Sequence, residues 1–398
     1  MMLEIIAIVF IVVTIIIAFI DILPISKDWL SRIYIGRYTN KQEWNQSITQ
    51  VGVKWLNHTP KIKVTDNTRL IAIDMLKGNY SKSVIQHWQE ASLLLGLNEC
   101  LKNNEDKSLK NGIEQFLNAK FDANGNWKNA PSNIDSAILA YGVMKLEGIN
   151  IERFKPAYDS TWLLIQSHIG EDGTVQYRNF MKNYRYVDTI GFICPFLVTY
   201  GLKYDKPECV ELAVKQLEQY QQNGMLDDHY IPSHAYHMDN AMPLGLYGWG
   251  RGLGWLAIGL IDAWHELPET HQYKPRLEHF VTKFAKSILT FQGKDGNWNW
   301  TVTRRESRAD SSATATLGWF LLQASQIEEI ADECMEGTER AIQYLMKVTR
   351  RNGAVDFSQG DTKDIGVYSM LFNVLPFTQG FCIRIINHYK HSRVAYKG

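Results

Sequence analysis

Six strongly apolar segments recur along the chain, each with the pattern of a buried helix. They begin near Ser81, Asp135, Asp188, Gly252, Asp310 and Asp364, and successive starts lie 53 to 64 residues apart. More polar, amphipathic segments separate them, over residues 41–57, 105–120, 152–168, 206–222, 273–292 and 328–350. Long alternating patterns typical of strands are absent, so the chain is predicted to be all-α.

A glycine turn follows five of the polar segments: ANGNW, EDGTV, QNGML, KDGNW and RNGAV. Asn-Gly and Asp-Gly supply the positive φ that tight turns require. Polar helix, glycine turn and apolar helix thus repeat six times, which is typical of units that bury their faces on one another. We expect a closed (α/α)6 toroid of six helical hairpins with the apolar helices inside.

The toroid places the starts of all inner helices at one end. Because helix N-termini carry the positive end of the helix dipole and free N–H groups, this mouth attracts anionic ligands. Asp135, Asp188, Arg251 and Asp310 would all lie there. Each aspartate could simply cap its helix. Asp135 and Asp188 start adjacent inner helices, however, and a facing pair of carboxylates is the usual equipment for acid–base chemistry on sugars.

The first residues differ from the rest of the chain. From Ile5 to Ile20 every residue is apolar except Thr14, which is close to the length that spans a bilayer. Neither a basic start nor a small-residue cleavage site of a signal peptide is present. We expect a membrane anchor over residues 1–23, a linker over 24–40, the toroidal domain over 41–390 and a tail over 391–398.

Basic residues follow the apolar run, and together they bear on the orientation of the anchor. They are Lys27, Arg32, Arg37 and Lys41. By the positive-inside rule, they place the large domain on the cytoplasmic side of a single-pass anchor.

Composition excludes several classes of function. Lys plus Arg equals Asp plus Glu at 42 each, so the basic footprint of a nucleic-acid-binding protein is missing. The five cysteines are scattered, without a CxxC pair, and no HExxH pattern occurs. We therefore expect reduced thiols, no metal site and no nucleic-acid partner.

The segment YGWGRGLGWLAIGLIDAW, residues 247–264, combines close-packing glycines with an arginine between two tryptophans. It satisfies a relaxed dinucleotide fingerprint, but no strand precedes it and no βαβ unit follows. Glycine packing alone leaves Arg251 unexplained. Its planar fork matches a carboxylate with two hydrogen bonds, and Trp249 and Trp255 would bracket it with flat apolar faces.

Several of these motifs resemble the unsaturated glycuronyl hydrolases of glycoside hydrolase families 88 and 105. WGRGLGW resembles a WGRGNGW-type motif, with Leu253 in place of the usual asparagine, and DSSATATLGW resembles a further helix start. YVDTIGFICPFL and NIDSAIL resemble the segments that carry the two active-site aspartates, which map to Asp188 and Asp135. YHMDNAM resembles the Tyr-His segment, which maps the sugar-contacting histidine to His237, with His234 as the alternative.

The resemblance implies an enzyme that removes a terminal 4,5-unsaturated uronic acid from lyase-generated oligosaccharides by hydrating the C4=C5 bond. Asp188 and Asp135 would be catalytic. Arg251, Trp255, His237 and Trp249 would bind substrate, and no cofactor would be needed. Two alternatives remain open: an inverting glycosidase acting on a saturated sugar, and a catalytically idle glycan-binding toroid in a membrane polysaccharide assembly.

Overall fold

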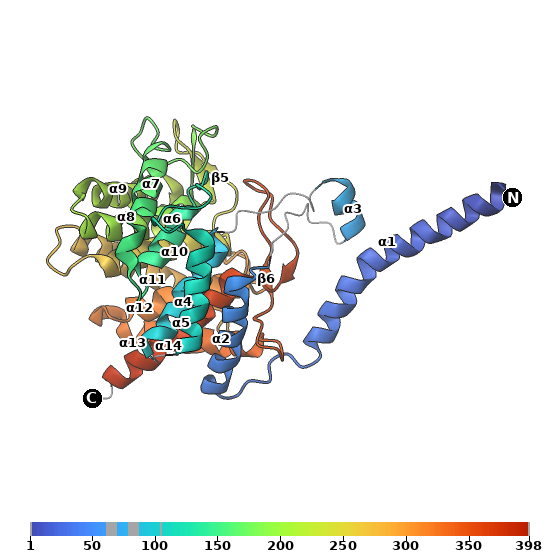
Figure 1. Cartoon of the computed structure of the whole chain (residues 1–398). Helices are drawn as coiled ribbons and strands as arrows, with labels where there is room; N and C mark the ends of the chain where they lie inside the picture. The colour runs from blue at the N-terminus through green and yellow to red at the C-terminus, as the bar shows by residue number, and fades with distance from the viewer. Residues whose placement is uncertain (1, 61–69, 79–86, 104–105, 397–398) are drawn as a thin grey trace.

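The computed structural model describes residues 2–60, 70–78, 87–103 and 106–396 (Figure 1). Beyond residue 40 these form a helical domain. Its outer helices are α2 (Lys41–Asn57), α5 (Lys107–Lys120), α7 (Lys155–Gln166), α9 (Pro207–Gly224), α11 (Lys274–Thr290) and α13 (Ala331–Lys347). Its inner helices are α4 (His87–Asn103), α6 (Ser136–Met144), α8 (Val187–Lys203), α10 (Gly250–Glu266), α12 (Ser311–Ala324) and α14 (Pro376–Tyr396).

The inner helices close into a ring. Each contacts the next one along the chain, and α14 contacts α4. Helix α10 lies close to α8, because glycines leave room for the facing backbone. A Cβ at Gly259 would lie 2.5 Å from the Ile190 carbonyl oxygen, and one at Gly191 would lie 2.8 Å from the Trp255 carbonyl oxygen. The (α/α)6 toroid predicted from the repeat is confirmed.

Short elements join the hairpins. One sheet contains β1 (Tyr184–Tyr186), β4 (Ala235–His237) and β5 (Pro243–Leu244) in that order, and two-stranded pairs are formed by β2 (Met225–Leu226) with β3 (Ile231–Pro232) and by β6 (Ser358–Gln359) with β7 (Phe372–Asn373). Single 3-10 turns span Ile151–Phe154, Asp227–His229 and Glu328–Ile330, and the short helix α3 spans Ile71–Leu76. Strand β1 leads directly into α8, and β6 contacts α12.

Four of the five predicted glycine turns have the expected backbone. Gly125, Gly173, Gly296 and Gly353 have φ between +70° and +91°. The prediction is wrong for Gly224, which is the last residue of α9 and leads directly into β2. A Cβ there would lie 2.8 Å from the Tyr220 ring, so close packing rather than a turn accounts for the glycine.

The prediction for the last inner helix is also wrong. The segment after Asp364 makes an isolated bridge from Asp364 to Val367 and then forms β7, and the helix begins only at Pro376. Proline favours the first helical turn and disfavours a helical residue before it, so Pro376 sets the start of α14. The predicted start of the first inner helix near Ser81 lies outside the described residues.

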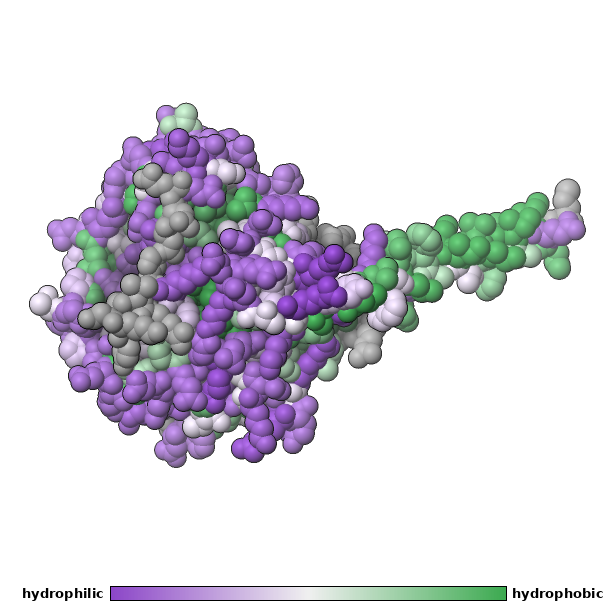
Figure 2. Space-filling model, turned by 90° about the horizontal axis from the view of Figure 1, so that it is seen from below, coloured by the Kyte–Doolittle hydropathy of each residue, from purple (hydrophilic) through white to green (hydrophobic). Residues whose placement is uncertain are grey.

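The apolar N-terminal segment forms α1 (Met2–Arg32), which projects from a largely polar domain as a long apolar helix (Figure 2). Its length, and a mean hydropathy of 3.2 over 18 of its residues, are those of a helix that could span a membrane, and a signal sequence near an N-terminus has the same properties. The structure differs from the expected linker over 24–40, because the helix continues to Arg32. The following residues pack on the domain, with the Gly36 amide donating to the Thr349 carbonyl at 3.0 Å.

Candidate active site

The charged residues predicted at the mouth all start inner helices. Asp135 and Asp310 directly precede α6 and α12, and Asp188 and Arg251 are the second residues of α8 and α10. Gln359 of β6 ties two of these starts together, because its N–H donates to Asp310 at 3.0 Å and its carbonyl accepts from Arg251. The mouth is therefore a connected structure rather than a set of separate helix ends.

Asp188 is a buried carboxyl group whose negatively charged form is poorly stabilised by its surroundings. It is 9% exposed, and its Oδ2 atom has no hydrogen-bond partner among the described residues. Burial raises the pKa of Asp188 to about 7, with a further rise from nearby Asp361, while Arg251 and Arg178 oppose it. A carboxyl group with such a pKa can both give and take a proton near neutral pH.

His234 is the histidine beside Asp188. Its Nε2 atom lies 3.6 Å from Asp188 Oδ2, and burial lowers the pKa of His234 to about 3, so the ring is neutral. The Tyr368 hydroxyl accepts from the Leu246 N–H at 2.8 Å and lies 3.3 Å from His234 Nδ1, so its own proton can point to that nitrogen. The Nε2 proton then faces Asp188.

His237 lies elsewhere. It sits at the end of β4, with its ring 5.4 Å from Tyr184 and its Nδ1 atom 3.8 Å from Asp239. His234 lies in a bend just before β4 and is 3% exposed, whereas His237 ends the strand and is partly exposed. The geometry thus favours His234, the alternative match, as the histidine of the site.

Arg251 is 2% exposed, and only part of its guanidinium group makes hydrogen bonds within the described residues. Its Nη2 atom donates to the carbonyls of Gln359 and Gly360, whereas its Nε and Nη1 atoms have no partner in the described part of the chain. Buried guanidinium donors without acceptors are costly. Donors of a buried cation that are left without an acceptor suit an anionic ligand.

The tryptophans do not bracket Arg251 as predicted. Trp249 donates to the Gln359 side chain at 2.9 Å and lies 4.4 Å from the His234 ring. Trp255 lies in the core below the mouth, 4.6 Å from Phe192 and 2% exposed. The aromatic ring nearest the Arg251 guanidinium is instead Trp88, at 5.8 Å.

Asp135 is the second buried carboxyl group at the mouth. It is 1% exposed, and neither of its oxygens has a hydrogen-bond partner among the residues that the structure describes. Burial raises the pKa of Asp135 to about 7, against the influence of His87 and the Trp88 amide. His87 lies 3.6 Å from Glu90, which in turn pairs with Lys120 at 2.6 Å.

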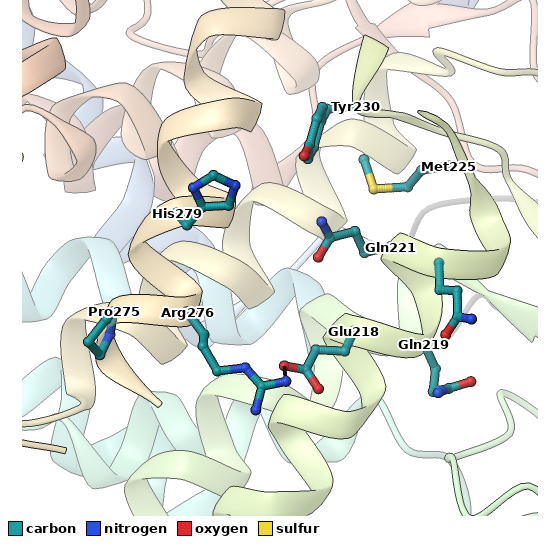
Figure 3. A pocket seen from close by; sticks show the side chains of 9 residues that line it. Glu218, Gln219, Gln221, Met225, Tyr230, Pro275, Arg276 and His279 are labelled. Atoms are coloured by element: carbon teal, nitrogen blue, oxygen red, sulfur yellow. Dashed lines mark ion pairs between the residues drawn. The ribbon is translucent and has the colours of Figure 1, made fainter. Parts of the chain in front are cut away.

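A small cleft of about 30 Å³ opens beside Asp188. It is lined by Tyr177, Arg178, Tyr186, Asp188, His234, Thr362, Lys363 and Asp364. The lining carries two cations, Arg178 and Lys363, and two carboxyl groups, Asp188 and Asp364. A second groove, between α9 and α11, carries an Arg276–Glu218 ion pair and has Tyr230 and His279 in its wall (Figure 3). It lies on the outer layer, away from the unpartnered carboxyl groups.

Sequence reasoning missed Trp88, His87, Arg178 and Lys363. The pair His87–Trp88 opens the described part of α4, so its place among the inner-helix starts was a usable signal. Arg178 and Lys363 lie in connecting segments without periodicity, and only the folded chain brings them to Asp188. Leu253 is fully buried in the core. Trp127 and Trp298, beside two of the glycine turns, are buried core residues that donate to backbone carbonyls.

Comparisons with known structures agree with this architecture. The chain is similar to a possible GH105 family member from Salmonella enterica serovar Paratyphi A, at 16% identity and a TM-score of 0.75, covering 90% of this chain and 96% of the other. It is similar to an unsaturated glucuronyl hydrolase of Bacillus sp. GL1 responsible for glycosaminoglycan degradation, at 13% identity and a TM-score of 0.64, covering 88% and 96%. Comparison with curated protein sequences gives no match.

A family model described as Glycosyl Hydrolase Family 88 matches residues 55–383. This range includes all four charged residues at the mouth and every inner helix except the end of α14. The match confirms the resemblance inferred from the motifs. The chain therefore belongs to Glycosyl Hydrolase Family 88 and is a glycoside hydrolase.

Proposed function

We propose that the enzyme removes a terminal 4,5-unsaturated uronic acid from oligosaccharides by adding water across the C4=C5 enol ether. Arg251 supports this choice of substrate, because it is a buried cation with unpartnered donors that an anion such as the carboxylate attached to C5 could accept from. The names of similar proteins agree with this substrate, and one of them is an unsaturated glucuronyl hydrolase specific for heparin. Arg178 and Lys363 in the cleft lining are cations that an acidic sugar could contact.

Asp188 carries out both proton transfers in this proposal. Its protonated form gives a proton to C4, and the resulting cation at C5 is stabilised by the ring oxygen. The carboxylate then takes a proton from the water that adds to C5. The hemiketal opens to a ketone at C5 and leaves a hemiacetal at C1, which releases the aglycone as an alcohol.

The neighbours of Asp188 keep it suited to both duties. Burial holds the pKa of Asp188 at about 7, so the acid and its conjugate base are both accessible near neutral pH. Neutral His234 can direct its Nε2 proton to Asp188 Oδ2 without adding a charge that would favour the anion. We assign to Asp135, the second buried carboxyl group, the positioning of a sugar hydroxyl and the tuning of Asp188.

The observation that carries the proposal is that one mouth holds two unusual groups. Arg251 is buried with two nitrogen atoms that have no hydrogen-bond partner among the described residues, and Asp188 has a carboxyl group with a pKa of about 7. The test offers the full-length enzyme a panel of lyase-generated disaccharides and follows loss of the ultraviolet band of the conjugated enol acid. The matched saturated disaccharides serve as controls. Turnover of saturated sugars with no turnover of unsaturated ones would contradict the hydration mechanism and favour the inverting glycosidase.

We also propose that α1 anchors the enzyme in a membrane with the catalytic domain on the cytoplasmic side. Support comes from the apolar run to Leu23 and from the basic residues Lys27 and Arg37, both exposed, that follow it. The full chain should sediment with membranes, and protease added to intact cells should leave the domain uncut. Cleavage from outside would reverse the orientation, and a soluble full chain would remove the anchor.

A further inference from the structure

The end of α1 is attached to the domain by side chains rather than by chain connectivity alone. Arg32 donates from Nε and Nη2 to the two carboxylate oxygens of Asp356, at 2.6 and 2.9 Å, and also to the Phe372 carbonyl at 3.1 Å. One turn earlier, Asp28 accepts from Asn373 at 2.7 Å and from Arg350 at 3.2 Å. Figure 1 shows this end of α1 on the side of the domain that carries β6.

These contacts attach α1 to both ends of the β6–β7 hairpin. Asp356 lies two residues before the hairpin and is fully buried, and Asn373 ends the hairpin. Arg350 joins the two, donating to Asp356 at 2.7 Å and to Asn373 at 2.8 Å. Although burial opposes it, the hydrogen bonds from Arg32 and Arg350 hold the pKa of Asp356 below its ordinary value. A bidentate, buried pair of this kind is geometrically specific.

The same hairpin holds the arginine of the active site. Three residues after Asp356, the Gln359 carbonyl accepts from Arg251, and the Gly360 carbonyl lies 3.2 Å from the same Arg251 nitrogen. These two carbonyls are the acceptors that orient the guanidinium and leave its Nε and Nη1 atoms for a ligand. Phe357, between the two contact points, has a φ of +60°, so the segment adopts a backbone that needs support from its surroundings.

We infer that Asp28 and Arg32, on the helix that precedes the domain, are positioning residues of the active site, which act by holding the β6–β7 hairpin and, through it, Arg251. They lie five and nine residues beyond Leu23, and a helix rises about 1.5 Å per residue. Arg32 therefore holds the hairpin roughly 14 Å along the helix from the end of the apolar run, at a set distance and orientation. A flexible linker would impose neither constraint.

The first test measures carboxylate recognition, and it rests on the proposed function. Full-length Arg32→Ala is compared with wild type on an unsaturated disaccharide and on its uronate methyl ester. Lys27→Ala is the matched control, because Lys27 is an exposed cation on the same helical turns, away from the hairpin. Arg32→Lys, which keeps the charge but loses the fork, should fall between Arg32→Ala and wild type.

We expect Arg32→Ala to raise KM for the acid about tenfold with a much smaller change in kcat, and to lower the ratio of kcat/KM for acid over ester. A merely structural role would reduce the amount of active enzyme and so lower the apparent kcat for both substrates equally, leaving KM and that ratio unchanged. An unchanged ratio in Arg32→Ala, or an equal change in Lys27→Ala, overturns the inference.

A second test does not depend on catalysis. The Gln359 amide donates to Asp310 and the Gly360 amide to the Leu371 carbonyl at 2.8 Å, so both report on the hairpin. Hydrogen exchange at these two amides should be at least tenfold faster in full-length Arg32→Ala and Asp28→Ala than in Lys27→Ala. Unchanged exchange overturns the inference. Absence of wild-type turnover on every unsaturated substrate, with faster exchange in Arg32→Ala, would remove the proposed function and leave the structural coupling standing.

Discussion

Asp188 and Asp310 begin inner helices at the same mouth, yet their surroundings differ. Asp310 accepts from the Ser312 amide at 2.9 Å, from the Ser312 hydroxyl at 2.8 Å and from the Gln359 amide at 3.0 Å. The Oδ2 atom of Asp188 has no hydrogen-bond partner among the described residues, and His234 Nε2 lies 3.6 Å from it. An aspartate whose acceptors are filled stabilises the structure, whereas one left buried without donors is available for proton transfer.

The largest expected difference between the two aspartates is in catalysis. Asp188→Asn keeps the size of the side chain but cannot donate a proton to C4. Loss of a positioned acid–base group costs about 10²–10⁴ in rate, and one group serving two steps places the loss at the upper end. The measurement is kcat on an unsaturated disaccharide, with circular dichroism to verify folding.

Asp135→Asn is the matched comparison for that experiment, because it removes the other buried, unpartnered carboxyl group. We expect it to reduce kcat less, or to act mainly by shifting the pH profile of kcat/KM. Near-normal turnover by Asp188→Asn together with a large loss in Asp135→Asn would exchange the two roles.

Arg251 offers the next largest effect. Arg251→Lys keeps the charge but loses the fork, so binding of the acidic substrate should weaken by roughly 1–3 kcal/mol, the range for charge-assisted hydrogen bonds. Arg251→Ala should cost more. Inhibition constants of a non-reacting uronate analogue would measure this, and wild-type affinity in both variants would make Arg251 a structural residue.

The raised pKa of Asp188 should make the stability of the folded protein depend on pH. Burial raises the pKa of Asp188 from 3.8 to about 7, so the folded protein binds this proton more tightly than the unfolded chain does. The corresponding stability is present below about pH 4 and is lost as the pH rises toward 7. Asp188→Asn should therefore be more stable than wild type at about pH 8, by roughly 1–3 kcal/mol, and show no advantage near pH 4. Thermal unfolding at both pH values decides; an advantage of equal size at both would refute this account.

The smallest expected effect concerns Asp310, and it should be on stability rather than on chemistry. Asp310→Ala removes the cap of α12 and the acceptor of the Gln359 amide, so the free energy of unfolding should fall by about 1–2 kcal/mol. The pH profile of kcat should keep its shape. A changed profile would mean that Asp310 takes part in proton transfer, and the contrast with Asp188 would fail.

Local signals in the sequence were enough for the architecture. Helix α2 spans Lys41–Asn57, the range that amphipathic spacing predicts, and four glycine turns have the positive φ that Asn-Gly and Asp-Gly favour. Such features depend on neighbours a few residues away, which the sequence displays directly. The start of α14 was mispredicted because apolar residues after Asp364 resemble a helix, whereas pairing of β7 with the distant β6 holds them extended.

The sequence by itself determined the ring of hairpins and which residue types stand at its mouth, because helix periodicity and helix starts are local properties. Only the tertiary structure decided which of those residues have hydrogen-bonding atoms without a partner. Asp310 is satisfied by Gln359, some fifty residues later, while Asp188 and the Arg251 Nε and Nη1 atoms meet no such partner among the described residues. The choice of His234 over His237 and the grip of Arg32 on Asp356 have the same origin. Hydrogen bonding and desolvation depend on what folding brings within a few ångströms, and spacing along the chain does not encode that.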